Sequence, residues 1–332
     1  MIGEYYKFFE CCVVVKGANR AAIYDLQRLN FHFIPNSVIE VFKDYENKKI
    51  SSLYNDYASQ KEQLEKYFKY LLTNELIFKT DNPESFPKMS SVLEKPHVLD
   101  FLFLEIDDLQ NFKLDFLENC IDKTGLEHLV VINSNNSIQN FETVLNLLNY
   151  SRVKMITFIS VFDENLIVDI LKLKSKHERL KKIIFVNSPI KFLKIEDDQN
   201  IDYFPNSLEI LLTRRIKSTK NFTLNTKTYL ESLNNNLYFN RKVYISNSGE
   251  VKPSFVQKDF FGNIEKENLN DIILKDGFQR VWKITKDEIE VCKDCEFRYM
   301  CPDNRIPLKN DRLYYHETSC SYNPYTNKWK SI

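Results

Sequence analysis

Four cysteines near the end of the sequence have the residue type and spacing to bind one metal centre. They are Cys292, Cys295, Cys301 and Cys320, in the pattern C-x2-C-x5-C-x18-C. The two-residue gap lets two thiolates reach one metal from a single turn, and the wider gaps return the others from neighbouring loops. Four thiolates bind either a tetrahedral zinc ion or an iron–sulfur cluster. The sequence therefore predicts one thiolate metal site here.

Residues close to these cysteines are candidates for supporting roles. His316 lies four residues before Cys320 and is an alternative zinc ligand. Arg298 and Tyr299 lie inside the cysteine loop, where they can donate hydrogen bonds to cluster sulfurs or simply pack beside them.

The remaining candidates have weaker patterns. Glu105, Asp107 and Asp108 follow the first apolar run of the central region, where parallel barrels place their active sites, although a solvated loop explains them equally well. Cys11 and Cys12 lie in an apolar strand, where alternation directs one side chain inward and one outward. Cys120 lies on an amphipathic stretch, and we expect it to face the core.

Composition narrows the class of protein. The chain has 332 residues, with 46 basic and 46 acidic side chains, so no basic excess indicates a nucleic-acid partner. No apolar run approaches the roughly 18 residues needed to span a membrane. The sequence starts without the basic and apolar segments of a signal peptide. Seven unevenly spaced cysteines suit a reducing compartment, so we expect a cytoplasmic protein without membrane partners.

The first part of the chain, residues 1–90, has strands, then helices, then a strand. This order predicts a winged-helix-like domain, and the proline- and serine-rich segment 81–96 predicts a linker after it. The expected elements are strands at 8–16, 21–34 and 76–80, a helix that begins after Pro35, and a helix at 60–74 with apolar residues at helical spacing.

The central part, residues 91–237, alternates short apolar runs with amphipathic stretches. This alternation predicts an α/β fold with a parallel sheet covered on both faces. The region is too short for a complete eight-fold barrel of about 250 residues, so we expect a partial (β/α) barrel or an open sheet. The expected strands are 98–106, 128–134, 154–162, 181–188 and 208–214, and the expected helices are 113–124, 137–151 and 164–178.

The last part, residues 238–332, resembles the SPASM domain of peptide-modifying radical S-adenosylmethionine enzymes. A hairpin in YISNSGEVKPS, the turn FFGNI, the helix start NLNDII within a helix at 268–283, and CKDCEFRYMC follow in that family's order. Such domains hold two auxiliary [4Fe–4S] clusters, and the four cysteines match the ligands of the second. Ser254 and Arg305 stand where the first cluster would have cysteine ligands. The resemblance implies one [4Fe–4S] cluster, with zinc as the alternative.

The same resemblance implies that radical chemistry is absent. Radical S-adenosylmethionine enzymes carry C-x3-C-x2-C after their first barrel strand, and here no cysteine follows that strand until Cys120. We therefore expect neither S-adenosylmethionine binding nor a catalytic residue set, and a fold that resembles the radical S-adenosylmethionine barrel in a degenerate form.

The whole chain resembles the SPASM-domain maturase of the grasp-with-spasm ribosomal peptide systems, through ECCVVVKGANRAAIYDLQR as well as the cysteines. That resemblance implies two partners, a precursor (leader) peptide and an ATP-grasp ligase. The leader would add as a strand to a sheet edge among residues 8–34, beside the helix 60–74. Two alternatives remain: an enzyme with a different activity at the barrel mouth or at the auxiliary cluster, and a zinc-stabilised protein-interaction module.

Overall fold

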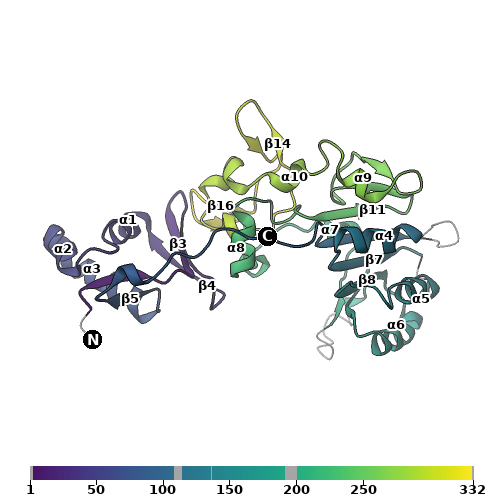
Figure 1. Cartoon of the computed structure of the whole chain (residues 1–332), viewed down its shortest axis with the longest axis horizontal. Helices are drawn as coiled ribbons and strands as arrows, with labels where there is room; N and C mark the ends of the chain where they lie inside the picture. The colour runs from purple at the N-terminus through teal and green to yellow at the C-terminus, as the bar shows by residue number, and fades with distance from the viewer. Residues whose placement is uncertain (1–2, 108–113, 136, 191–199, 331–332) are drawn as a thin grey trace.

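The structure, a computed structural model, describes residues 3–107, 114–135, 137–190 and 200–330. Helices of the N-terminal part gather at one end of an elongated molecule, and a large sheet with its helices occupies the other end (Figure 1). The C-terminal loops lie between these two ends, against the sheet that contains β3.

The N-terminal part contains two small sheets and three helices. Strands β2, β3 and β4 form an antiparallel sheet in that order, and β1 pairs with β5. Two of the expected strands are each divided by a turn, and α2 is a helix that the sequence pattern did not predict. The elements are β1 (Tyr5–Phe8), β2 (Cys12–Lys16), β3 (Arg20–Asp25), β4 (Asn30–Pro35), α1 (Asn36–Asp44), α2 (Ile50–Asp56), α3 (Lys61–Thr73) and β5 (Ile77–Thr80).

One face of the three-stranded sheet packs on these helices. Ile23 and Ile34 from the sheet lie in one buried cluster with Val38 and Phe42 from α1 and Phe68 from α3. The winged-helix interpretation of this part stays a prediction.

The central part confirms the predicted α/β class. Within the described residues, eight strands form one mixed, mostly parallel sheet in the order β10-β9-β8-β7-β6-β11-β12-β13. Its central strands neighbour one another in chain order, as in a (β/α) barrel. The strands are β6 (Phe101–Ile106), β7 (His128–Asn133), β8 (Met155–Val161), β9 (Leu180–Val186), β10 (Ile201–Tyr203), β11 (Lys242–Ile245), β12 (Glu250–Lys252) and β13 (Gly262–Asn263).

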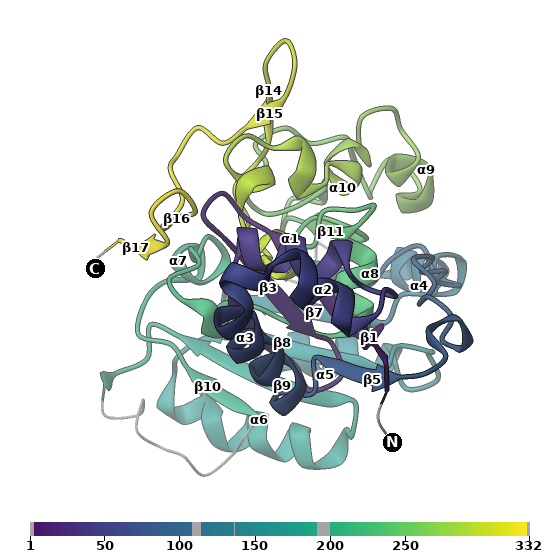
Figure 2. The same ribbon diagram turned by 90° about the vertical axis from the view of Figure 1, so that its left-hand side faces the viewer.

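The two faces of this sheet are covered differently. Helices α4 (Asp115–Thr124), α5 (Ile138–Leu147) and α6 (Glu164–Lys176) pack on one face, which follows from parallel strands in chain order joined by right-handed crossovers. Figure 2 shows α6 alongside the strands β8 to β10. The opposite, inner face packs against residues around α7 (Leu208–Leu212), including Phe204, Leu208 and Leu211.

The strand predicted at 208–214 is wrong, because this segment forms the helix α7. Leu208, Leu211 and Leu212 follow the spacing of three and four residues that places side chains on one helical face. Ser207 precedes the helix, and its hydroxyl accepts a hydrogen bond from the Ile210 amide at 3.4 Å. An apolar run of this length cannot be assigned to strand or helix by hydrophobicity alone.

The predicted hairpin is present, and it continues the large sheet. β11 pairs antiparallel with β12 and parallel with β6, so residues beyond 237 complete the central sheet. The helix predicted at 268–283 is instead two helices, α9 (Leu269–Ile273) and α10 (Arg280–Lys283). Gly277 lies between them with φ of 83°, a left-handed conformation that one continuous α-helix cannot contain.

The other elements of the chain are short. Among the residues that the structure describes, every helix is too short or too polar to traverse a lipid bilayer. The remaining elements are α8 (Thr226–Ser232), the 3-10 turns η1 (Ala58–Gln60), η2 (Pro83–Ser85), η4 (Thr219–Asn221), η5 (Lys286–Glu288), η6 (Cys292–Asp294) and η7 (Arg298–Met300), and the strands β14 (Leu308–Lys309), β15 (Tyr314–Tyr315), β16 (Tyr322–Asn323) and β17 (Lys328–Trp329).

An aromatic cluster joins the N-terminal sheet to the C-terminal loops. Phe297 is 1% exposed, and its ring centroid lies 5.7 Å from that of Phe31 and 5.8 Å from that of Phe33 on β4. On its other side the ring meets Tyr322 at 4.9 Å and Phe222 at 5.1 Å. The second face of the N-terminal sheet is therefore buried against the segment that carries the cysteines.

We predict that Phe297→Ala lowers the free energy of unfolding by about 3–5 kcal/mol, because truncation leaves a cavity among five aromatic rings. Urea denaturation followed by circular dichroism measures this change. Phe260→Ala is the matched control, since Phe260 is 55% exposed and its loss should change stability by less than about 0.5 kcal/mol. Equal effects of the two substitutions would contradict the role of Phe297.

Candidate metal centre

The four predicted cysteines come together around one small cavity. Its volume is about 30 Å³, and all four line it. Cys292 begins the turn η6 and Cys295 follows it, Cys301 follows the turn η7, and Cys320 precedes β16. All seven cysteines of the chain are free thiols, so no disulfide competes with metal binding at this position.

Local backbone geometry explains how closely spaced cysteines face the same cavity. The Cys295 amide donates to the Cys292 carbonyl oxygen at 3.0 Å, which closes a tight turn between these two cysteines. Val291, immediately before this turn, has φ of 66°, a conformation that is costly for a β-branched residue. This strain is retained because the residues on either side are held in place.

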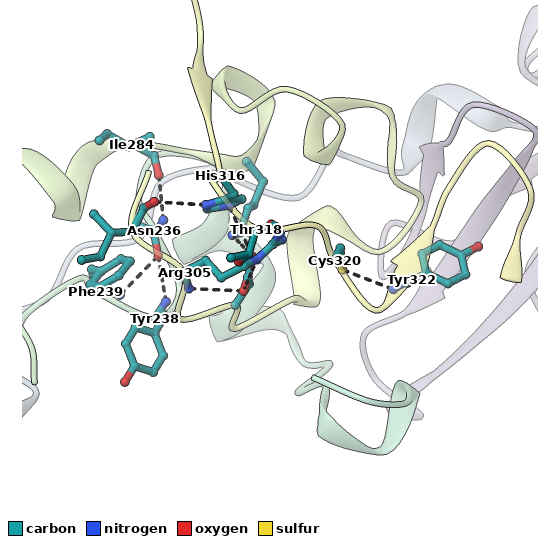
Figure 3. A network of polar contacts seen from close by, with 12 residues as sticks. Asn236, Tyr238, Phe239, Ile284, Arg305, His316, Thr318, Cys320 and Tyr322 are labelled. Carbon is teal, nitrogen blue, oxygen red and sulfur yellow. Dashed lines mark hydrogen bonds and ion pairs between the residues drawn. The ribbon is translucent and has the colours of Figure 1, made fainter. Parts of the chain in front are cut away.

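Two of the sulfur atoms accept hydrogen bonds from backbone amides. The Phe297 amide donates to the Cys295 sulfur at 3.4 Å, and the Tyr322 amide donates to the Cys320 sulfur at 3.4 Å. Figure 3 shows the second contact as a dashed line between Tyr322 and Cys320. Such amide donors stabilise negative charge on sulfur, and they are among the features that set the potential of iron–sulfur clusters.

Three of the four thiols have a raised pKa and so lose their protons less readily than a free thiol. Burial raises the pKa of Cys292, Cys295 and Cys301, and neighbouring thiolates add to this effect. Lys286 opposes it at Cys292 and Cys301. A bound metal must therefore displace the protons, so that its binding energy becomes part of the folding energy of these loops.

A buried charge network lies directly beside the cysteines. Asp303 is 5% exposed and accepts hydrogen bonds from the Arg305 guanidinium at 2.6 to 3.0 Å. Lys286, which is 4% exposed, lies 3.4 Å from the same carboxylate, and the His316 Nε2 atom lies 3.3 Å from it. Figure 3 shows Arg305 and His316 close to Thr318, on the loop that leads to Cys320.

The charges in this network determine which of its side chains are ionised. Burial alone would raise the pKa of Asp303, but Lys286 and Arg305 lower it well below its usual range. Burial would lower the pKa of Lys286, whereas Asp303, Cys292 and Cys301 raise it. Burial lowers the pKa of His316 to about 4, so this imidazole is neutral near pH 7. Two buried cations therefore face one carboxylate and the thiol cavity.

His316, the alternative zinc ligand, lies near Cys292 but not in a favourable donor set. Cys292, Asp303 and His316 each place a ligand atom within 4.8 Å of the others. Two cations already lie within 3.4 Å of the Asp303 carboxylate, so a third positive charge there would be repelled. The four thiols line one cavity, but among the described residues no three of their sulfur atoms lie within 4.8 Å of one another.

Arg298 and Tyr299 pack beside the site. Arg298 donates from Nη1 to the Lys16 carbonyl oxygen at 2.6 Å and to the Cys295 carbonyl oxygen at 3.1 Å. The Tyr299 hydroxyl donates to the Asp287 carboxylate at 2.9 Å. Of the two roles that the sequence suggested, these contacts favour packing, and Arg298 also fastens the loop to β2.

The weaker candidates are the strand-end carboxylates and the other three cysteines, and all of them lie well before the four-cysteine segment in the sequence. The Tyr244 hydroxyl donates to Glu105 at 2.5 Å, and Asn247 donates to the Asp107 carboxylate; Asp108 lies outside the described residues. Cys120 is 1% exposed, as predicted, and burial raises its pKa to about 12. Cys12 is buried and Cys11 is half-buried, also as predicted from alternation.

Sequence reasoning missed three residues that shape the site. Lys286 and Asp303 supply its charges, and Glu296 ties its backbone to the N-terminal sheet. Asp303 had one detectable signal, because it lies two residues after Cys301. Lys286 lies six residues before the first cysteine in a polar segment, where nothing separates it from a surface lysine.

Comparisons with known proteins give distant likenesses only. No protein-family model matches the chain, and no curated protein matches it. A crystal structure of BtrN in an open conformation is 12% identical over 60% of this chain and 94% of that chain, with a TM-score of 0.33. SuiB from Streptococcus suis, bound to S-adenosylmethionine, is 9% identical over 90% of this chain and 94% of that chain, with a TM-score of 0.29.

SuiB has also been crystallised bound to its precursor peptide SuiA. That structure is 9% identical over 90% of this chain and 94% of that chain, with a TM-score of 0.30. At these values the likeness decides neither the fold nor the site, which rest on the residues and distances above.

We predict that replacing any one of Cys292, Cys295, Cys301 or Cys320 by serine removes most of the bound metal, because each thiolate is one of four ligands. Elemental analysis and visible absorption of anaerobically purified protein measure the loss. Hydrogen exchange should then speed up in residues 286–330 before it does in strands β7 and β8, since metal binding and local folding are coupled. Cys120→Ala is the matched control and should keep its metal. Full metal occupancy in a ligand variant would contradict the assignment.

Proposed function

We propose that this protein takes part in the maturation of a ribosomally made peptide, by binding the leader of the precursor and presenting the peptide to an ATP-grasp ligase. In this proposal residues 1–90 recognise the leader, residues 91–237 are a scaffold, and residues 238–332 hold one metal–thiolate centre. The observation that carries the proposal is an unpaired strand edge beside a helix in the N-terminal part.

That edge belongs to β4. It pairs with β3 on one side only, and it is the last strand of its sheet. Helix α3 borders it, because His32 on β4 meets Tyr70 on α3, with 2.9 Å between the imidazole Nδ1 and the hydroxyl oxygen. An exposed strand edge next to a helix is the arrangement to which an extended peptide adds as a further strand.

Side chains along β4 offer apolar contact to such a peptide. Phe33 is 38% exposed and Tyr70 is 39% exposed. Arg20 lies 3.4 Å above the Phe33 ring, and its charge is already paired with Glu296 at 2.8 Å. A leader with alternating apolar side chains would complement this surface.

The donor set and the spacing of its sulfur atoms support a [4Fe–4S] cluster at the four cysteines. Four thiolates at about 2.3 Å from one tetrahedral zinc ion lie roughly 3.8 Å from one another. Among the described residues, no three of these sulfur atoms lie within 4.8 Å of one another, which is the wider spacing that a cluster needs. A cluster ligated by four protein thiolates supplies electron transfer or local stability. Cys292, Cys295, Cys301 and Cys320 would hold it, and amides of Phe297 and Tyr322 would offset its charge.

The inner face of the sheet is a packed core. Val130, Ile132 and Tyr244 on this face form an apolar cluster with Phe204 and Leu208 from the segment around α7. Barrel enzymes have a filled interior too, so the scaffold role of residues 91–237 in this proposal rests on the sequence, which has no C-x3-C-x2-C motif after the first strand.

We predict that Tyr70→Ala weakens leader binding about tenfold, the usual effect of removing an aromatic contact from an interface. Isothermal titration with the short peptides encoded beside this protein measures the affinity. Tyr150→Ala is the matched control, because Tyr150 is a fully exposed aromatic residue on the distant part of the chain. Unchanged affinity of Tyr70→Ala, or the absence of any binding peptide, would remove the leader-recognition role.

We also predict that the reconstituted, reduced protein releases no 5′-deoxyadenosine from S-adenosylmethionine above background. Four thiolate ligands occupy every ligand position that the protein offers, and S-adenosylmethionine needs an iron without a protein ligand. Liquid chromatography with mass spectrometry measures the product, and peptide binding by the same sample shows that the protein is folded. Stoichiometric release would overturn the assignment of a degenerate barrel.

A further inference from the structure

A second cavity lies at the amino ends of the parallel strands, away from the cysteines. Its volume is about 400 Å³, and its wall includes Phe101, His128, Met155 and Lys242. These four are the first residues of β6, β7, β8 and β11, and their Cα atoms are register partners across neighbouring strands. Register partners in parallel strands point to the same face, so the four side chains form one row.

The row places a half-buried amine at the cavity wall. The Lys242 Nζ atom lies 5.2 Å from the centroid of the Phe101 ring and 4.6 Å from that of Tyr238. Within the part of the chain that the structure describes, no carboxylate or carbonyl oxygen accepts a hydrogen bond from it. An ammonium that is partly withdrawn from water without an acceptor is costly, and aromatic faces compensate only in part.

The neighbouring carboxylates already have partners. Asp100 pairs with Lys95 at 2.6 Å and with His97 at 2.5 Å. Glu231 pairs with Lys95 at 3.0 Å and accepts a hydrogen bond from Asn240 at 2.8 Å. Among the described residues, Lys242 therefore has no hydrogen-bonded acceptor and faces a cavity, although Glu231 and Asp100 favour its charge from a longer distance.

The rest of the wall is partly apolar and partly charged. Phe101, Met155 and Leu237 supply apolar surface for the carbon skeleton of a small acid. Apart from Lys242 and His128, the polar part of the wall consists of Asp100, Glu127, Lys154, Lys227, Thr228, Glu231 and Asn240. His128 contacts the Thr157 hydroxyl at 2.8 Å, and burial lowers its pKa to about 4, so it contributes a neutral ring. Burial also lowers the pKa of Lys242 to about 8, as expected for an amine short of partners.

We propose that this cavity binds the carboxylate of a small organic acid or of a chain end, with the carboxylate on Lys242 and an apolar group against Phe101 and Met155. An amine beside apolar side chains is a common feature of a ligand site, and Lys154 and Lys227 offset two of the three carboxylates on this wall. The site does not depend on the metal centre or on leader binding.

Matched probes test the charge requirement directly. N-acetyl-leucine carries the carboxylate, and N-acetyl-leucinamide has the same shape without the charge. We expect the acid to bind with a Kd of about 1 mM or tighter in ligand-observed NMR, and the amide to bind at least tenfold more weakly. N-acetyl-alanyl-alanyl-leucine distinguishes the source: tighter binding than N-acetyl-leucine indicates a chain end, and weaker binding a small acid.

Variants locate the site. Lys242→Met replaces the amine with a side chain of similar length, should retain the melting temperature because it removes a half-buried charge, and should weaken binding of the acid at least tenfold. Lys172→Met, at an exposed lysine on α6, should bind as the parent does. N-acetyl-leucine should also protect Lys242 from reductive methylation, read by mass spectrometry. Equal binding of acid and amide, or undiminished binding by folded Lys242→Met, would overturn the proposal.

Discussion

The arrangement of the chain depends on the buried contacts of Glu296, which lies between Cys295 and Phe297 in the sequence. Its side chain is fully buried, and its carboxylate meets Arg20 at 2.8 Å and the Tyr322 hydroxyl at 2.5 Å. A buried carboxylate is tolerated only with such partners, because its desolvation is costly. The Tyr24 hydroxyl donates to the Glu296 carbonyl oxygen at 2.6 Å, and a side chain at Gly17 would come within 2.9 Å of the Glu296 amide nitrogen. Two regions far apart in sequence are thus held together at one residue.

The contacts of Glu296 hold the edge strand β4 and the four cysteines in one folded unit. β4 presents its edge outward, while Phe31 and Phe33 on the same strand rest on Phe297, whose amide donates to the Cys295 sulfur. A metal that orders the cysteine loops therefore also orders the surface on which the N-terminal sheet rests. In the proposed function the centre has a role without chemistry of its own, because it fixes the position of the recognition strand.

The sequence predicts most of the central strands and groups the four cysteines that line one cavity, since buried parallel strands and clustered cysteines are strong local signals. Prediction from the sequence fails where a contact between distant segments decides the local structure. Leu208–Leu212 is apolar enough for a strand, and only its packing against the inner face of the large sheet selects the helix. The break at Gly277 depends on one left-handed residue. Lys286 and Lys242 are ordinary lysines in sequence, because their burial follows from segments that are distant along the chain.

The two ends of the central sheet differ in how their polar groups are satisfied. At the carboxyl ends, Glu105 and Asp107 bind Tyr244 and Asn247 from β11 and the turn that follows it, so these carboxylates are used within the fold. At the amino ends, Asp100 and Glu231 have other partners, and among the described residues Lys242 has no hydrogen-bonded acceptor beside a cavity. A charge without a hydrogen-bonded acceptor next to open volume is where a ligand gains most from binding, because part of the cost of removing the charge from water has already been met. The proposed ligand site therefore lies at the end of the sheet opposite to the one that barrel enzymes use.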